Sequence, residues 1–156
     1  MTVSRRINFD ESIPRMIERL KSEHIVFESK LVQIENSIKM NNIKLAAQIV
    51  QDMAEKIMQH AVEEEARLMR VIMKNAKDES SESIKIMQEH NWLMNFLNNR
   101  LMLIKNAATS SDPAEYKKAI RDLNEFVYNL RKHFKEEEQI VFPLTLRSES
   151  ATYLES

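Results

Sequence analysis

The chain has 156 residues, of which 43% are hydrophobic and 30% charged, and this length and balance predict a single soluble domain with a core of its own. It contains no glycine, so it lacks the glycine-rich loops that bring backbone amides against phosphates, which excludes P-loop and dinucleotide-binding enzymes. Because 23 Lys and Arg nearly balance 24 Asp and Glu, the charge gives no reason to expect nucleic acid or an anionic membrane as a partner.

The lack of glycine for tight hairpins and the surplus of Glu, Lys, Leu, Met and Ile predict an all-α fold. Prolines and clusters of asparagine and serine divide the chain into four predicted helices. The first helix covers about residues 13–39, and its apolar seam follows alternating steps of four and three residues. This seam consists of Ile13, Ile17, Leu20, His24, Phe27, Leu31, Ile34 and Ile38.

The second and third predicted helices repeat this rhythm over about residues 43–74 and 81–107. The seam of the second helix is interrupted by the polar Arg67 and consists of Ala46, Val50, Met53, Ile57, His60, Glu64 and Val71. The seam of the third helix consists of Met87, His90, Met94, Leu97, Leu101, Ile104 and Ala108.

The fourth predicted helix covers about residues 113–142. It begins at a capping box formed by Asp112 and Glu115 around Pro113, and Pro143 is expected to stop it. Its seam consists of Leu123, Phe126, Leu130, His133, Glu137, Ile140 and Leu144. Short connections then predict an up-down-up-down antiparallel four-helix bundle, with both chain ends frayed or lying along it.

The composition also limits the compartment and the metal ligands. Because cysteine is absent, disulfides and thiolate sites are excluded and His, Asp and Glu remain as ligands. The first ten residues lack the apolar stretch of a signal peptide, and no segment approaches the ~18 apolar residues of a membrane span. We therefore expect a cytoplasmic protein.

Each predicted helix carries one histidine on its apolar seam. These are His24, His60, His90 and His133. Counted from the shared turns at about 1.5 Å per residue, neighbouring histidines differ in height by no more than about one and a half helical turns. The four imidazoles can therefore meet in one layer of the bundle.

Two glutamates accompany the histidines in a repeated pattern. Three consecutive glutamates follow His60 after two residues, and the same spacing follows His133. The seam rhythm turns the fourth residue after each histidine inward, which selects Glu64 and Glu137. The outer members of the two triplets are predicted to lie on solvated faces; they are Glu63, Glu65, Glu136 and Glu138.

Burying six ionisable groups in an apolar bundle costs several kcal/mol per unpaired group unless a cation compensates. Two divalent ions would balance two glutamates, and four imidazoles with two bridging carboxylates would make two sites. The sequence therefore predicts a dinuclear metal centre. A single histidine on a helix seam is ordinarily a hydrogen-bonded core residue, so a metal-free structural bundle in which histidines and glutamates merely pair is the alternative.

These residues resemble the hemerythrin-like family, whose HHE cation-binding domains are four-helix bundles that hold a non-haem di-iron centre. The resemblance spans nearly the whole chain, and it rests on Glu23-His24, His60-x-x-x-Glu64, Glu89-His90 and His133-x-x-x-Glu137-Glu138 followed by Ile140-Val141-Phe142-Pro143. It implies one such domain over residues 1–156 with two iron ions. By this resemblance His24 and His60 would bind one iron, His90 and His133 the other, and Glu64 and Glu137 would bridge them.

Oxygen-carrying members of that family have a further histidine one turn away on the third helix, where this chain has Met94 and Ile86. The missing ligand would leave a coordination position for water, O2, peroxide or NO. The resemblance thus implies binding of O2 or a related small molecule for storage, sensing or stress protection. The alternatives are a redox enzyme or iron-handling protein that consumes such molecules at the same site. Nitrogen and oxygen ligands also admit Mn or Zn. Glu28 follows His24 by four residues but lies off the seam, so it is not expected to bind metal.

Overall fold

A computed structural model describes residues 6–155, and these residues form helices and short connections without any strand. No helix in this part of the chain is long and apolar enough to cross a membrane. The helical elements in chain order are α1 (Ile13–Lys39), α2 (Ile43–Glu63), a π-helical turn (Glu64–Met69), α3 (Arg70–Asn75), a 3-10 turn (Lys77–Glu79), α4 (Ser80–Asn95), a π-helical turn (Phe96–Arg100), α5 (Leu101–Ala108), α6 (Pro113–Glu136), a π-helical turn (Glu137–Val141) and α7 (Phe142–Glu155).

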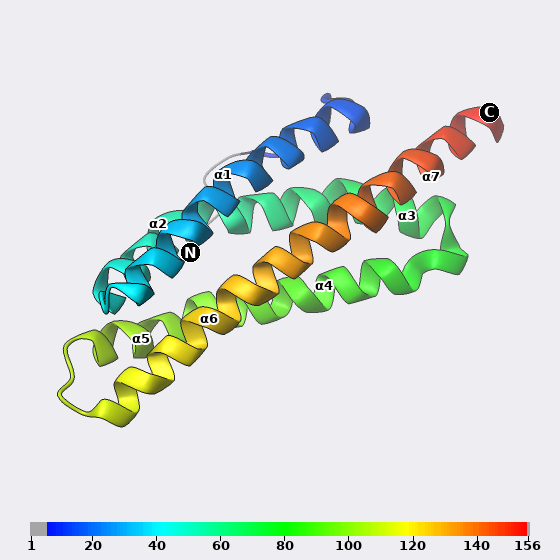
Figure 1. Cartoon of the computed structure of the whole chain (residues 1–156). Coiled ribbons are helices and arrows are strands. Elements are labelled where there is room, and N and C mark those ends of the chain that lie inside the picture. The colour runs from blue at the N-terminus through cyan, green and yellow to red at the C-terminus, as the bar shows by residue number, and fades with distance from the viewer. Residues whose placement is uncertain (1–5, 156) are drawn as a thin grey trace.

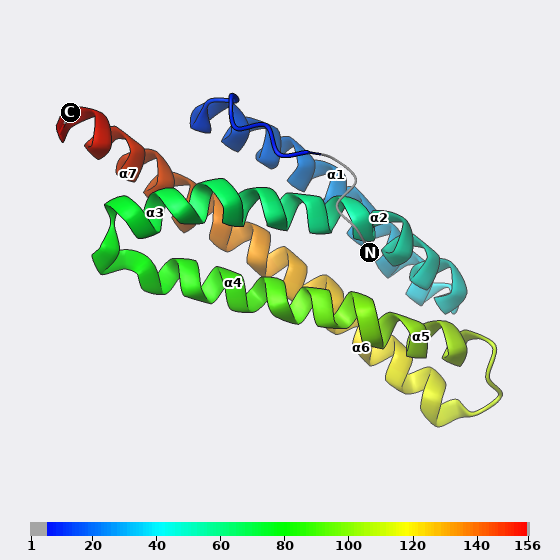
Figure 2. The ribbon, with the colours of Figure 1, turned by 180° about the vertical axis from the view of Figure 1, so that it is seen from behind.

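Because each π-helical turn continues one α-helix into the next, the described residues make four long helical stretches that pack as a helical bundle (Figure 1). α1 lies against α2 and α6, α5 lies against α2 and α6, and α3 lies against α7. The turn after α1 and the loop before α6 lie at one end, and the connection before α4 lies at the other, as the opposite view also shows (Figure 2).

Polar side chains cap the helices at the positions that the sequence indicates. Ser12 accepts a hydrogen bond from the first turn of α1, and Asp112 does so for α6, whose first residue is Pro113. In the turn between α1 and α2, Asn41 has a φ of 57°, in the left-handed region that glycine usually occupies. Asparagine thus takes the place of glycine in a chain that has none.

The prediction that Pro143 ends the fourth helix is wrong, since the chain continues as α7 to Glu155. Pro143 is the second residue of α7 and lies two residues after the end of a π-helical turn. In that turn the backbone pairing has already departed from the α-helical pattern, so the missing N–H of proline is better tolerated than inside a regular helix. The start of α7 is packed and not frayed, because Leu144 and Thr145 are at most 2% exposed.

The π-helical turns also change which positions face inward. Ile140, predicted to lie on the seam, is 41% exposed, whereas Val141 is 1% exposed. After the turn that follows α2, Val71 is only half-buried and Ile72 is fully buried. A π-helical turn contains about one residue more than an α-helical turn, so the buried seam moves on by one position.

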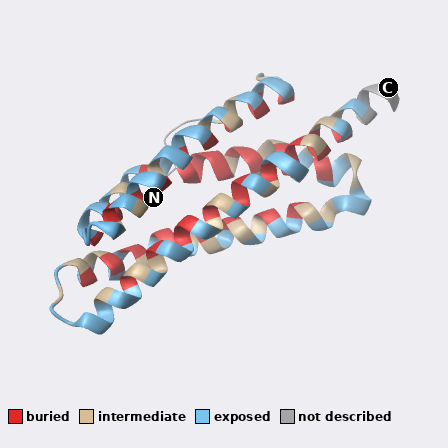
Figure 3. Ribbon diagram, viewed as in Figure 1, coloured by how far each residue is buried: buried red, intermediate tan, exposed pale blue. Residues whose placement is uncertain are grey.

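The apolar interior falls into two clusters of buried side chains. The large core cluster lies around α5 and the first part of α6 and includes Phe27, Leu31, Ile34, Val50, Ile57, Phe96, Leu101, Phe126, Leu130 and Phe134. The small core cluster consists of Ile13, Met16, Ile17, Leu20, Leu68, Met69, Ile72, Ile86, Val141, Phe142 and Leu144. In every helical stretch the buried histidine lies where one cluster gives way to the other, along the interior that Figure 3 shows as buried.

Candidate metal centre

The structure brings all six sequence-predicted site residues together between the two core clusters. No residue of this polar layer is more than 5% exposed. The layer consists of His24 on α1, His60 at the end of α2, His90 on α4, His133 on α6, and Glu64 and Glu137, which follow α2 and α6.

The two inward glutamates share a backbone setting. Glu64 is the first residue of the π-helical turn after α2, and Glu137 is the first residue of the turn after α6. Such turns widen the helix locally and occur frequently at functional sites. The first two helical stretches form one helical hairpin, and the last two form another. The equivalent position of both turns explains how each hairpin delivers a carboxylate to the same layer.

The Nε2 atoms of the histidines point toward these carboxylates. His24 Nε2 lies 3.0 Å from Glu137 Oε1 and 3.2 Å from His60 Nε2. His60 Nε2 lies 3.3 Å from Glu64 Oε2. On the other side of the layer, His90 Nε2 lies 3.2 Å from Glu64 Oε1.

Two groups of donor atoms result, and within each group the atoms lie no more than 4.8 Å from one another. One group consists of His24, His60, Glu64 and Glu137, and the other of His90, His133, Glu64 and Glu137. Both glutamates belong to both groups. This is the arrangement that two neighbouring cations bridged by carboxylates require.

Each imidazole is also held from outside by a second glutamate on its Nδ1 atom. The four pairs are His24–Glu138 at 3.1 Å, His60–Glu23 at 2.9 Å, His90–Glu65 at 3.0 Å and His133–Glu89 at 2.7 Å. A carboxylate on Nδ1 orients the ring and directs Nε2 inward. The pairing repeats between the hairpins, because the outer carboxylates come from the residue before His24 or His90 and the residue after Glu64 or Glu137.

Sequence reasoning missed this outer shell. It placed Glu65 and Glu138 on solvated faces, yet each joins a buried histidine of a different helical stretch. The one available signal was the repetition itself, since Glu-His occurs on both the first and third helices. Helical periodicity describes one helix at a time, so it cannot identify a partner across the bundle.

The expectation that Glu63 is solvated is wrong, because its side chain is buried, with 3% of the residue exposed. Glu63 accepts from Arg19 at 2.6 Å and from Gln59 at 2.7 Å. Arg19 also donates to Glu23, the carboxylate that holds His60 Nδ1. The network around the site therefore extends from α2 to the first half of α1.

Glu28 lies outside both groups of donor atoms. Its carboxylate accepts from Arg131 of α6 at 3.0 Å, and its side chain is 48% exposed. This position agrees with the expectation that Glu28 does not bind metal, and it makes Glu28 a useful control for the inward glutamates.

The layer favours positive charge at two of its histidines. Burial opposes the charged form of His60, but the carboxylates of Glu64 and Glu23 outweigh it and raise its pKa to about 9. Burial likewise opposes charge on His90, and Glu64 with Glu65 raises its pKa to about 9. In the absence of metal, protons on these two rings would partly balance the buried carboxylates.

Three other groups of the layer, His24, His133 and Glu64, have lowered pKa values. Burial, and then the nearby charge of His60, lowers the pKa of His24. Burial lowers the pKa of His133 despite its bond to Glu89. Although burial opposes its ionised form, Glu64 has a pKa far below its usual range because His60 and His90 stabilise the carboxylate.

Several inward atoms lack hydrogen bonds of good geometry. They are both carboxylate oxygens of Glu64, Oε2 of Glu137 and Nε2 of His90. Buried polar atoms left in this way are costly, whereas imidazole nitrogen and carboxylate oxygen are suitable ligands for Fe, Mn or Zn. The residues of the layer therefore fit a pair of metal ions.

Comparison with known families supports this interpretation. Residues 83–153 match the hemerythrin HHE cation-binding domain. The matched segment includes His90, His133 and Glu137, and the remaining three residues of the layer precede it. No curated protein and no solved structure gave a significant match to the chain. The hemerythrin match and the two donor groups together indicate a metal-binding helical protein.

The two sides of the polar layer have different walls. Phe134 stacks on His24 with ring centroids 4.2 Å apart, and Phe27 meets the ring of His60 edge-on at 5.6 Å. Aromatic rings thus pack against both imidazoles of this side, and a pocket of about 460 Å³ lined by His24, Phe134 and Glu138 opens beside them. The rings of His90 and His133 instead contact each other, with centroids 4.9 Å apart.

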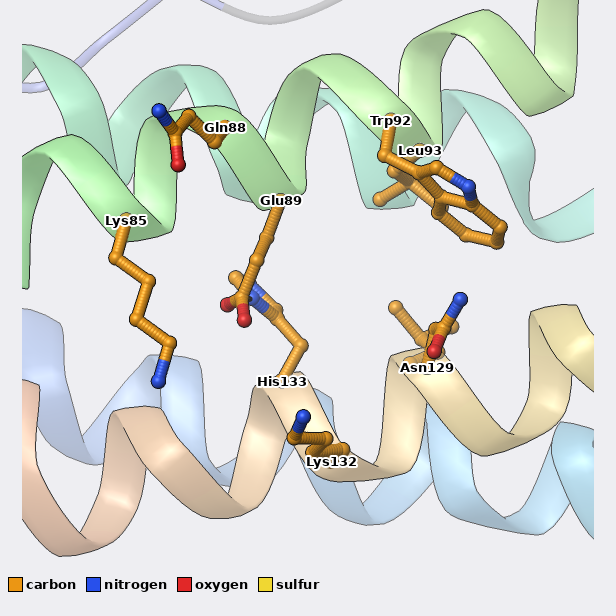
Figure 4. Close-up of a pocket in the computed structure, with 9 residues that line it drawn as sticks. Lys85, Gln88, Glu89, Trp92, Leu93, Asn129, Lys132 and His133 are labelled. Carbon is orange, nitrogen blue, oxygen red and sulfur yellow. Dashed lines mark hydrogen bonds and ion pairs between the residues drawn. The ribbon is translucent and has the colours of Figure 1, made fainter.

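A pocket of about 250 Å³ between α4 and α6 reaches the outer edge of the layer (Figure 4). Glu89 and His133 face each other at its back, while Lys85, Trp92 and Asn129 line its sides. The pocket therefore brings solvent, or a small molecule, as far as the carboxylate that holds His133 Nδ1.

Proposed function

We propose that the whole chain, residues 1–156, is a single hemerythrin-like domain, an up-down-up-down antiparallel four-helix bundle that binds two metal ions in its polar layer. In this proposal His24 and His60 bind one ion, His90 and His133 bind the other, and Glu64 and Glu137 bridge them. The observation that carries it is the pair of buried donor groups that share both glutamates. The first half of the chain repeats the His-x-x-x-Glu pattern found in the matched second half.

Iron is the metal we propose, because it is the metal of the family that the sequence resembles. The charges of the site support ions of high charge. Two bridging carboxylates and four outer carboxylates surround the four imidazoles, which is enough negative charge to balance two trivalent ions. Manganese and zinc accept the same donor atoms, and intrinsic affinity ranks zinc above ferrous iron.

The function we propose is binding of O2, or of a related small molecule such as peroxide or NO, for storage, sensing or stress protection in the cytoplasm. A bound iron pair would supply the electrons for such chemistry. The chain's own residues orient the imidazoles through Nδ1 and stack an aromatic ring on His24. On the third helical stretch Ile86 and Met94 offer no further nitrogen or oxygen ligand, which leaves room for an external ligand.

A redox enzyme or iron-handling protein is the second candidate, in which the same site consumes the small molecule. The pocket beside His133 and Glu89 favours it, because about 250 Å³ accommodates a reactant larger than a diatomic molecule. In that case Glu89 would lie between the reactant and the metal ligand His133. Turnover under steady supply of peroxide or NO distinguishes this candidate from reversible binding.

Elemental analysis of the purified protein tests the metal proposal. We expect about two iron ions per chain, and a marked loss of bound metal in Glu64→Gln. Glu28→Gln is the matched control, since Glu28 lies on a neighbouring helix outside both donor groups. Protein that folds normally but binds no metal when reconstituted with ferrous iron would favour the structural bundle instead.

Absorption spectra separate carriage from catalysis. Ferrous protein prepared under argon should gain a visible absorption band in air, and removal of O2 should reverse it if the protein is a carrier or sensor. Irreversible oxidation with multiple turnovers would instead support the enzyme. Absence of any spectral change in iron-loaded protein would contradict both.

A further inference from the structure

One face of α1 is exposed along nearly the whole helix. Its residues follow alternating steps of three and four, as in a helix-pairing seam, and every one of them is exposed. This outer strip consists of Glu18, Ser22, Ile25, Ser29, Val32, Asn36 and Lys39. At its centre Ile25 is 74% exposed and Val32 is 42% exposed, although both are large apolar side chains.

The charges at the two ends of the outer strip are opposite. Every seventh residue gives the order acid, apolar, apolar, base, in Glu18, Ile25, Val32 and Lys39. Read in the opposite direction, the same order is base, apolar, apolar, acid. The strip is therefore complementary in charge and in apolar position to a reversed copy of itself.

No other element of residues 6–155 is available to cover the outer strip. α1 uses its opposite side against α2, α6 and α7. The acids beside the strip, Glu28 and Glu35, are turned toward α6, because Arg131 donates to both at 2.6–3.0 Å. They therefore leave the apolar centre of the strip uncovered, and Arg131 offsets part of their negative charge.

We propose that the outer strip is the interface of a homodimer in which α1 of two copies packs antiparallel. A twofold axis between Glu28 and Ser29 sets Ile25 opposite the partner's Val32. It also sets Glu18 opposite the partner's Lys39. A parallel pair would instead place Glu18 against its own copy, so charge selects the antiparallel arrangement.

The geometry of α1 suits such a pair. The strip spans about 32 Å at 1.5 Å per residue, and its small Ser22 and Ser29 allow close approach of the two helices. Two single helices bury less than the roughly 1,200–2,000 Å² of a standard stable interface. We therefore expect a dissociation constant in the micromolar range, in a dimer that does not require the metal centre.

Sedimentation equilibrium over a range of protein concentrations tests the dimer. We expect Ile25→Glu to raise the dissociation constant at least about 100-fold, because it places a charge at the apolar centre of both halves of the interface. Met102→Glu is the matched control, since Met102 is 59% exposed on α5, away from the strip, and should leave the constant unchanged. Helicity and iron content should be the same in all these proteins.

Charge reversal tests the direction of packing. Glu18→Lys alone and Lys39→Glu alone should each weaken the dimer about 10-fold, because each places like charges opposite one another. The double variant exchanges both signs and should restore the original constant. Failure of the double variant to recover would overturn the antiparallel pairing.

A covalent trap gives an independent result, because the chain has no cysteine of its own. Ser29→Cys places one thiol beside the proposed twofold axis and should form a disulfide-linked dimer on mild oxidation. Asn124→Cys, exposed on α6, should not. A wild-type protein that remains monomeric at millimolar concentration, or that instead binds lipid vesicles through Ile25, would overturn the proposal.

Discussion

The two core clusters on either side of the polar layer differ in size and composition. The large core cluster holds the aromatic side chains Phe27, Phe96, Phe126 and Phe134. The small core cluster has one aromatic side chain, Phe142, among aliphatic residues and methionines. A six-residue ionisable layer interrupts the apolar contacts between them, so the stability of the small-cluster end depends on how well the charges of that layer are compensated.

The largest expected effect comes from removing one of the two inward glutamates of the layer. In metal-free protein, Glu64→Ala would leave charge on His60 and His90 without the fully buried carboxylate that they share, which should cost about 3–5 kcal/mol of unfolding free energy. The loss is measured by urea unfolding in the presence of a chelator. Glu28→Ala should change stability by less than about 1 kcal/mol, and an equal loss in both variants would contradict the role of the layer.

Two fully buried leucines allow the clusters themselves to be compared. Leu31 belongs to the large core cluster and Leu68 to the small one, and each is 0% exposed. Replacement by alanine should cost about 4 kcal/mol at Leu31 and about 2–3 kcal/mol at Leu68, because the smaller cluster can close around the cavity more easily. Hydrogen exchange should show that Leu68→Ala increases opening of α3 and α7 while α5 stays protected. Identical exchange patterns would mean that the layer does not separate the clusters.

The protonation of the layer predicts a pH dependence in metal-free protein. His60 and His90 have pKa values near 9 in the folded chain and an ordinary value of 6.5. The folded state therefore binds their protons more tightly, so this stabilisation is complete below pH 6.5 and is lost as the pH rises toward 9. We expect a fall of about 1 kcal/mol per pH unit for each of the two histidines across this interval, measured by thermal or urea unfolding. Metal-loaded protein should lack this fall, and a flat profile without metal would contradict the proposed charges.

The smallest effects concern two arginines that tie α1 to its neighbours near opposite clusters. Arg19 bonds the buried Glu63, so Arg19→Ala should cost about 1–2 kcal/mol. Arg131 bonds the partly exposed Glu28 and Glu35, so Arg131→Ala should cost less than about 1 kcal/mol. Thermal unfolding of the two variants tests the order, and a larger loss at Arg131 would reverse it.

Much of the fold could be predicted from the sequence, because the helix boundaries depend on local chemistry. The stop at Met40-Asn41-Asn42 and the start at Pro113 need only turn and capping preferences. The six residues that meet in the layer could be selected because helical periodicity places them on apolar seams. Periodicity failed where a π-helical turn intervened, at Val71 and Ile140, since its extra residue leaves no signal in composition. The stop predicted at Pro143 rested on the missing N–H of proline, and it failed next to the same kind of turn.

The outer carboxylates could not be predicted for a different reason. Glu65 and Glu138 reach histidines on other helical stretches, so their role depends on the distance and rotation between helices. Glu63 likewise depends on Arg19, 44 residues away along the chain. A single-helix pattern contains none of this information, and only the repetition between hairpins indicated that these acids share a role.

The extra residue of each π-helical turn lies directly after an inward glutamate of the layer. Deleting one residue between Glu64 and Leu68, or between Glu137 and Val141, would restore a regular helix and leave Ile72 or Val141 on the buried seam. The helix that follows would still pack on the small core cluster, but the widened turn beside the glutamate would be lost. The length of these two segments therefore matters more to the polar layer than to the packing of the helices beyond it.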